Sequence, residues 1–239
     1  MAHALFTKKF LAKINTIIRN FWWAGHQEEG SSTPFHFRAW DDICQPKSMG
    51  GLGIKDLYNV NKSLLLKTAW NIVTEKDPNL TAILKGKYFH KSSFWTAPSS
   101  TPKSLFWASI LKIRETLTNN CSYQILRGNT TIWNQPWVQC WTNMHNLLST
   151  EQPATALPNS ISDLWLPNTK TWDYDKIKNL FGDQAATSIA NLTILNQDGP
   201  DILCWKPSTS GKCTARDAYN YLTATTHNQL PQTGSRSRS

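Results

Sequence analysis

Two adjacent carboxylates, Asp41 and Asp42, are the residues of this 239-residue chain that most invite a catalytic reading. Paired carboxylates can hold Mg²⁺, because hard cations prefer oxygen ligands and two metal ions can bridge a reacting phosphate. Such pairs lie in a strand-turn-strand among hydrophobic residues, whereas this pair directly precedes Ile43 and Cys44. We therefore predict that the two aspartates cap a helix, where carboxylates accept orphan backbone N–H groups.

Cysteine and histidine spacing indicates neither a metal centre nor a disulfide framework. No histidine pairs with another at i,i+4 beside a glutamate, and no Cys-x-x-Cys is present. Cys204, Cys213 and His227 could gather around Zn²⁺, but a structural zinc site needs four ligands at tighter spacing. We expect no metal, no cofactor and no catalytic residue. The five scattered cysteines favour a reducing compartment, so the nucleus or cytoplasm is expected rather than secretion.

Glycines at 50, 51 and 53 could be mistaken for a phosphate-binding loop. Such a loop needs a following Gly-Lys-Ser/Thr or a third glycine that opens a helix, and neither follows here. We predict instead a tight turn with positive φ that lets Leu52 and Ile54 enter the core before Asp56 starts a helix.

The elements that must position these residues are mostly helical in the first half. Apolar residues recur at spacings of three and four over residues 4–23, which predicts an amphipathic helix. This stretch has no acidic residue, so a mitochondrial presequence is an alternative interpretation. Further helices are predicted over about 55–75, from Pro78, and after Pro102. No run of eighteen apolar residues occurs, and no membrane span is expected.

The second half predicts short strands and then helices. Residues 121–126 and 130–133 flank a Gly-Asn turn and predict a hairpin, with Trp133, Trp137 and Trp141 clamping it. Helices are predicted around 173–195 and near the end, with a strand at 202–205. The expected fold class is α+β and mainly helical. The expected domains are 1–148, which is helical with a hairpin at its end, and a small α+β region at 161–223; a linker at 149–160 joins them, and 224–239 is a disordered tail.

Positive charge is concentrated in the first half of the chain. Residues 1–120 carry sixteen Lys/Arg against eight Asp/Glu, a net of +8 of the total +9. Phosphate contacts use mobile cations, so this excess favours a polyanionic partner, although a role in solubility alone is the alternative. Lys85, Lys87 and Lys91 surround two aromatic residues, which is the composition of a base-stacking groove and equally of solvated lysines over buried rings. Most of the twelve tryptophans are expected to pack in the core.

A series of motifs, taken in order, covers most of the chain. It consists of Phe21-Trp22-Trp23-Ala24-Gly25, Trp40, Cys44-Gln45-Pro46-Lys47, Gly50 to Ile54, Asp56-Leu57, Asn61, Leu64 to Trp70, Lys87-Tyr88, Ser104 to Trp107, Gly128 with Ile132 to Trp137, Trp205, Ser210-Gly211 and Ala218-Tyr219. This order resembles the segment that follows the polymerase core in plant LINE-type (non-LTR) retrotransposon reverse transcriptases. Gln135 stands where that family usually has Asp, and Cys213 to Arg216 replaces an alternating aromatic strand. The polymerase signature Ala-Asp-Asp and the later zinc-binding region are absent from this sequence.

The resemblance implies a non-catalytic fragment of an RNA-directed DNA polymerase polyprotein that binds nucleic acid without sequence preference. Its partners would be RNA or DNA and the remainder of the polyprotein, with no small-molecule substrate and no membrane. A structural scaffold without activity is the alternative, and an independent enzyme is not expected. Basic side chains in the first half are the candidate nucleic-acid-binding residues: Lys8, Lys9, Lys13, Arg19, Lys47, Lys85, Lys87 and Lys91.

Overall fold

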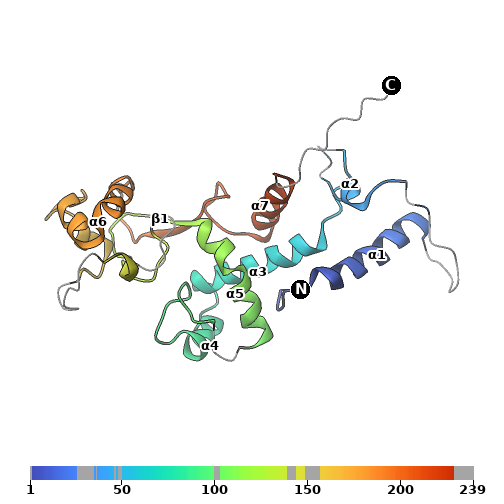
Figure 1. Cartoon of the computed structure of the whole chain (residues 1–239), viewed down its shortest axis with the longest axis horizontal. Coiled ribbons are helices and arrows are strands. Elements are labelled where there is room, and N and C mark those ends of the chain that lie inside the picture. Colours follow the sequence, from blue (N-terminus) through green and yellow to red (C-terminus); the bar gives the residue numbers. More distant parts are fainter. Residues whose placement is uncertain are drawn as a thin grey trace, which may run out of the picture. The chain divides into compact units, whose positions relative to one another are not determined.

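A computed structural model of the chain describes residues 2–25, 35, 37–45, 47, 50–99, 103–138, 144–148 and 157–228 (Figure 1). Contacts divide the chain into a first unit, Met1–Lys67 with Thr214–Ser239, and a second unit, Thr68–Cys213. The described residues form seven α-helices and one two-stranded antiparallel sheet. The predicted class, α+β and mainly helical, is therefore confirmed. No helix among the described residues has the length and hydrophobicity that crossing a bilayer requires.

Helix α1 (Lys8–Ala24) begins later than the predicted residue 4. The Thr7 hydroxyl accepts a hydrogen bond from the Phe10 N–H at 3.2 Å, which caps the helix and fixes its start. The preceding segment is held by Asn61, whose side chain accepts from Phe6 N–H at 2.9 Å and donates to the Ala4 carbonyl at 2.8 Å. These bonds use the backbone groups that a longer helix would need.

The short helix α2 (Trp40–Cys44) shows that the capping prediction for the two aspartates is wrong. Its N-cap is Ala39, which makes no side-chain cap bond, and Asp42 is an exposed residue within the helix. The side chain of Asp41 lies outside the described part of the structure. Because Ala39 already occupies the cap position, the carboxylates fall after it, in the helix itself.

The glycine turn has the predicted backbone but not the predicted packing. Gly50 and Gly53 have φ of 81° and 73°, conformations that glycine adopts without steric cost. Leu52, however, is 50% exposed, so its predicted burial is wrong. The reason is that the turn pairs its backbone with the preceding helix end: Leu52 N–H donates to Ile43 and Gly53 N–H to Gln45, at 3.0 and 2.9 Å.

Helix α3 (Leu57–Val73) follows, with its residues divided between the two units. As predicted, Asp56 starts it, because its carboxylate accepts from the Asn59 N–H at 2.8 Å. Within the first unit, helix α7 (Ala215–Asn228) contacts Asp56. The Asp56 N–H donates a hydrogen bond to the hydroxyl of Tyr219 on α7 at 3.1 Å. The end of α3 is closed by Glu75, which has a φ of 51°.

In the second unit, helices α4 (Pro78–Tyr88) and α5 (Leu105–Asn119) lie side by side (Figure 1). Both begin where the sequence predicts, α4 at Pro78 and α5 after Pro102, and the structure shows that their N-caps are Asp77 and Ser104. Trp107 on α5 stacks on Tyr88 at a centroid distance of 5.0 Å and on Phe89 at 5.6 Å. Aromatic stacking therefore joins the two helices.

The predicted hairpin is wrong, because its first strand pairs with a different segment of the chain. Strand β1 (Cys121–Gln124) pairs antiparallel with β2 (Ile202–Trp205), and not with residues 130–133. The cause is Asp201, whose carboxylate accepts N–H bonds from Leu126, Gly128 and Thr130 at 2.8 to 2.9 Å. These bonds turn the chain out of the sheet after β1, and residues 130–132 pair instead with 159–161.

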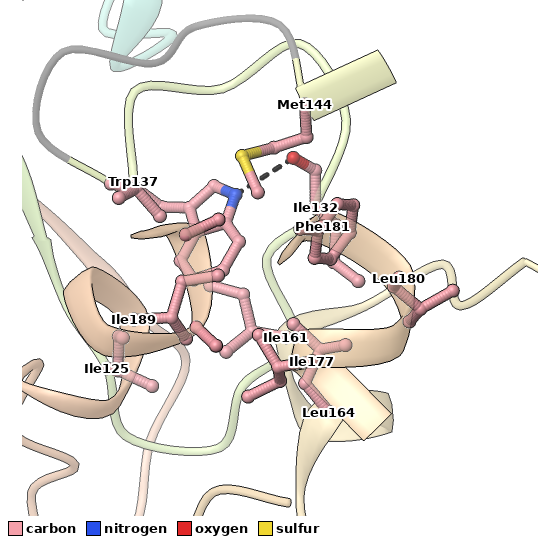
Figure 2. Packing of buried hydrophobic residues seen from close by; sticks show 13 residues of the cluster. Ile125, Ile132, Trp137, Met144, Ile161, Leu164, Ile177, Leu180, Phe181 and Ile189 are labelled. Carbon is pink, nitrogen blue, oxygen red and sulfur yellow. Dashed lines mark hydrogen bonds between the residues drawn. The ribbon is translucent and has the colours of Figure 1, made fainter. Parts of the chain in front are cut away.

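The core of the second unit lies between this turned segment and helix α6 (Tyr174–Ala190), as Figure 2 shows. The short 3-10 helices η2 (Met144–Leu147) and η4 (Ile161–Leu164) contribute Met144, Ile161 and Leu164. Trp137 is buried at the centre, and its indole N–H donates to the Ile132 carbonyl at 2.8 Å. The predicted core role of Trp137 is confirmed, whereas Trp141 lies outside the described residues.

The predicted linker at 149–160 remains a prediction, because residues 149–156 lie outside the described part. The compact units have other boundaries, and the core of the second unit takes residues from both sides of this stretch, from Ile125 to Met144 and from Ile161 to Ile189. Helix α7 extends to Asn228, and residues 229–239 of the predicted tail are not described.

Candidate nucleic-acid interface

Helix α1 presents three exposed lysines, Lys8, Lys9 and Lys13. Lys9 and Lys13 are one turn apart, so they share a face of the helix. Residues 2–25 contain no acidic side chain. The ion pairs found among the described residues are Arg127–Asp198 and Lys178–Asp183, so neither involves these lysines. Among the described residues, therefore, no carboxylate pairs with these three lysines.

Lys8 and Lys62 lie against the ring of Tyr58. Their Nζ atoms are 5.3 and 5.6 Å from the ring centroid, distances at which a cation is attracted by the ring quadrupole. Burial lowers the pKa of Lys62, and the positive charge of Lys8 lowers it further. Lys62 is not among the binding residues predicted from the sequence. Its position one turn after Tyr58 on α3 is the signal that could have identified it.

A second lysine–tyrosine contact in the same unit lies just before the start of α3. The Nζ of Lys55 is 5.5 Å from the ring centroid of Tyr219, and the Tyr219 hydroxyl accepts from the Asp56 N–H. Because the two partners are far apart in sequence, no local pattern could have predicted the pair. Lys55 is exposed and, like Lys62, adds to the basic surface of the first unit.

The other two candidates of the first unit differ from each other. Lys47 is exposed, and its carbonyl accepts from the Gly50 N–H at 3.1 Å. Arg19 is half-buried, and its Nε is covered without a hydrogen-bond partner among the described residues. A buried cationic donor with no acceptor is destabilising. Arg19 is therefore poorly placed to contact a phosphate through Nε.

Lys85, Lys87 and Lys91 are exposed in the second unit, on α4 and just after it. The rings between them, Tyr88 and Phe89, are buried by Trp107 and offer no free stacking face. Lys87 lies over Tyr88 with its Nζ 5.4 Å from the ring centroid. Of the two readings of this stretch, solvated lysines over buried rings is the one that the geometry matches.

The structure thus places the predicted basic residues in two groups. Five lie in the first unit, and three lie in the second. Trp22 on α1 is 51% exposed, whereas five other tryptophans are buried in the core: Trp70, Trp95, Trp107, Trp137 and Trp205. No cluster of three or more His, Cys, Asp or Glu side chains suited to a metal ion occurs within the described ranges.

Cys121, Cys204 and Cys213 lie near one another in the second unit without a disulfide. Burial raises the pKa of Cys121, and the neighbouring Cys213 raises it further. Burial also raises the pKa of Cys204. Thiols with raised pKa values are poor nucleophiles and poor metal ligands, because the thiolate is the reactive form.

Two proteins of Arabidopsis thaliana are similar to this chain. One, named "Putative ribonuclease H protein", is 25% identical over 228 residues, which are 93% of this chain and 36% of that protein. The other, named "Uncharacterized mitochondrial protein", is 29% identical over 134 residues, which are 55% of this chain and 85% of that protein. The chain therefore spans about a third of the length of the first relative. No protein-family model and no solved structure matches it.

Proposed function

We propose that this chain is a non-catalytic part of a retrotransposon-derived, reverse-transcriptase-like polyprotein, and that it binds RNA or DNA through phosphate contacts without reading sequence. The observation that carries the proposal is the exposed lysine face of α1, which has no acidic residue on its own helix and no ion pair with another described residue. Lysines in that condition attract a polyanion and release its counterions.

The order of the sequence motifs supports the same origin. A relative named for ribonuclease H aligns with nearly the whole chain, and a nucleic-acid partner is compatible with that name. Because the chain covers 36% of that relative, we propose no nuclease activity for it. The polymerase chemistry of the family would belong to other parts of such a polyprotein.

The proposal is tested by measuring fluorescence anisotropy of a labelled RNA–DNA hybrid and of single strands at about 50 to 300 mM salt. The double variant Lys9→Glu/Lys13→Glu reverses two charges on α1. The matched control is Lys206→Glu/Lys212→Glu, which makes the same change of net charge at two exposed lysines of the second unit.

The wild-type affinity should fall steeply with salt, and the α1 variant should lower the magnitude of the log–log slope by about two. The control should keep most of the wild-type slope. Equal losses in both variants would show that net charge alone attracts the nucleic acid. Absence of binding at the lowest salt would refute the proposed function.

Exposed apolar side chains on α1 favour a second candidate function, a protein-interaction scaffold. Ile17 is 68% exposed, Phe21 66% and Trp22 51%. Apolar groups gathered on one helix can mark a protein-binding surface. This function predicts self-association or binding of a hydrophobic dye, reduced by Phe21→Ser and Trp22→Ser, together with nucleic-acid affinity that is weak and indifferent to salt.

A further inference from the structure

The second unit contains a cavity of about 250 Å³ between the end of α3, α4 and the segment that follows β1. Pockets for drug-sized ligands measure roughly 300–1,000 Å³, so this cavity suits a smaller, fragment-sized group. All of its lining residues belong to the second unit.

One part of the lining is aromatic. Phe89, Phe94 and Trp95 contribute to it, and Phe94 meets each of the other two rings edge to face, at interplanar angles of 87° and 90°. The three rings are only 5–6% exposed, and their mutual packing holds them in fixed orientations, so they form a rigid apolar wall with little open ring face.

A second part of the lining carries directed polar groups. The Tyr123 hydroxyl donates to the Gln135 Oε1 at 3.1 Å, which orients the carboxamide. Burial raises the pKa of Tyr123 to about 12, and this donor therefore stays protonated at neutral pH. With its oxygen occupied, Gln135 retains an N–H₂ group that no described residue engages, and it can donate to a ligand.

The cavity is also lined by two opposite charges that do not pair with each other. Lys85 and Glu75 both border it, and neither belongs to an ion pair found among the described residues. A ligand with an anionic end and N–H donors could satisfy both groups.

Glu75 has a backbone conformation that is unfavourable for a residue other than glycine. It closes α3 in the left-handed region with a φ of 51°, while its N–H donates to Ile72 and the Lys76 N–H donates to Asn71. This pattern is a Schellman end, where glycine is the usual residue. Strained non-glycine residues concentrate at functional sites, so the carboxylate is a candidate for a binding role.

We infer that this cavity binds one unstacked nucleobase of a single-stranded nucleic acid. The base enters the cavity beside the aromatic wall and donates its N–H edge to Glu75. It accepts from Gln135, and Lys85 attracts the adjoining phosphate. The inference rests on the proposed function and assigns it a base-binding subsite. It requires a single strand, because the bases of a duplex are stacked and paired.

The test compares two labelled octamers by anisotropy at low salt, using the full chain. One is a single-stranded octathymidylate, and the other has the same phosphates but a tetrahydrofuran ring in place of every nucleoside. We expect the abasic strand to bind about tenfold more weakly, since the contacts of one base with the polar groups of the cavity are lost.

Two variants locate the effect. Glu75→Gly removes the carboxylate and relieves the strained backbone, so a loss of discrimination cannot be attributed to unfolding. Ser92→Phe fills the cavity from a half-buried position whose side chain has no hydrogen bond among those described, and Ser99→Phe is its exposed control. Both cavity variants should bind the two octamers with nearly equal affinity, whereas Ser99→Phe should discriminate as the wild type does.

The possible negative results distinguish failure of the base-binding cavity from failure of the phosphate-binding function. If wild type binds both octamers equally well, the cavity does not bind a base, and the proposed phosphate-binding function is unaffected. If neither octamer binds, both proposals are wrong. If wild type discriminates and both cavity variants still do so, the base binds elsewhere and the assignment of this cavity is overturned.

Discussion

The side-chain oxygen of Asn61 accepts a hydrogen bond from the backbone N–H of Phe6 at 2.9 Å, across 55 residues of sequence. The same fully buried carboxamide donates to Ala4. Asn61 therefore attaches the segment before α1 to α3, and with it the lysine face that we propose binds phosphate.

Asn61→Ala should lower the free energy of unfolding by about 1–3 kcal/mol, because it leaves part-buried backbone groups of Ala4 and Phe6 without their partner. Amide hydrogen exchange should accelerate over residues 4–11. Asn71→Ala, on the same helix, is the control: its side chain is half-buried and makes no hydrogen bond among those described, so its effect should be smaller. Equal effects would contradict the role of Asn61.

Asp201→Ala should destabilise the second unit by about 2–3 kcal/mol, since three backbone N–H groups lose a charged acceptor. Urea unfolding measures the change. Asp198→Ala removes a nearby carboxylate whose exposed contact with Arg127 is 3.9 Å long, and it should cost about 0–1 kcal/mol. A larger loss from Asp198→Ala than from Asp201→Ala would refute this account of the turn.

Two glycine substitutions should have opposite signs. Gly128 has a φ of 65°, and a Cβ there would lie 2.6 Å from the Ser162 backbone nitrogen, so Gly128→Ala should be destabilising. Gly86 lies within α4 with nothing near its Cβ position, and Gly86→Ala should stabilise by about 0.5–1 kcal/mol. Thermal unfolding of both variants checks the signs.

Glu75→Gly should raise the free energy of unfolding by about 1 kcal/mol, because glycine adopts the left-handed conformation at the end of α3 without steric cost. Asn168, with a φ of 59°, provides the comparison, and Asn168→Gly should have a smaller effect, since asparagine tolerates this region. Differential scanning calorimetry of the two variants distinguishes them. A destabilised Glu75→Gly protein would show that the carboxylate has a structural role.

Alkaline pH should destabilise the second unit. The pKa of Tyr123 is raised to about 12 from its ordinary 10.0, first by burial and then by neighbouring Cys121 and Asp201. The unfolded chain loses this proton first, so stability is complete below pH 10 and declines as pH rises toward 12. Urea midpoints at pH 8 and 10.5 should therefore fall more in wild type than in Tyr123→Phe. Equal declines would exclude Tyr123 as a contributor.

Local patterns were sufficient to predict the helices. The helix predicted over about 55–75 matches α3 nearly to its ends, and the one predicted after Pro102 matches the start of α5. Asp56 was identified as a helix start because its cap acts within three residues. The lysines were found by residue type and by their concentration in the first half of the chain. Lys62 was missed, although its spacing from Tyr58 is local to α3, because the proximity of Lys8 depends on how α1 and α3 pack.

Non-local relationships could not be predicted. Residues 121–126 and 130–133 have the composition of a hairpin, yet Asp201, more than 70 residues later, binds the turn between them and directs β1 to β2. The candidate base-binding cavity could not be predicted either, because Glu75, Lys85 and Gln135 come together only in the folded unit.

The pairing of Cys121 with Trp205 has a consequence for the order of folding. Bringing together strands that lie so far apart in the chain requires closure of a long loop, and such contacts slow folding relative to local ones. During synthesis, β1 emerges from the ribosome well before its partner, and its edge stays unpaired until Trp205 has been translated. The helices α4 and α5 can form in that interval, so β2 completes a second unit whose helical part is already in place.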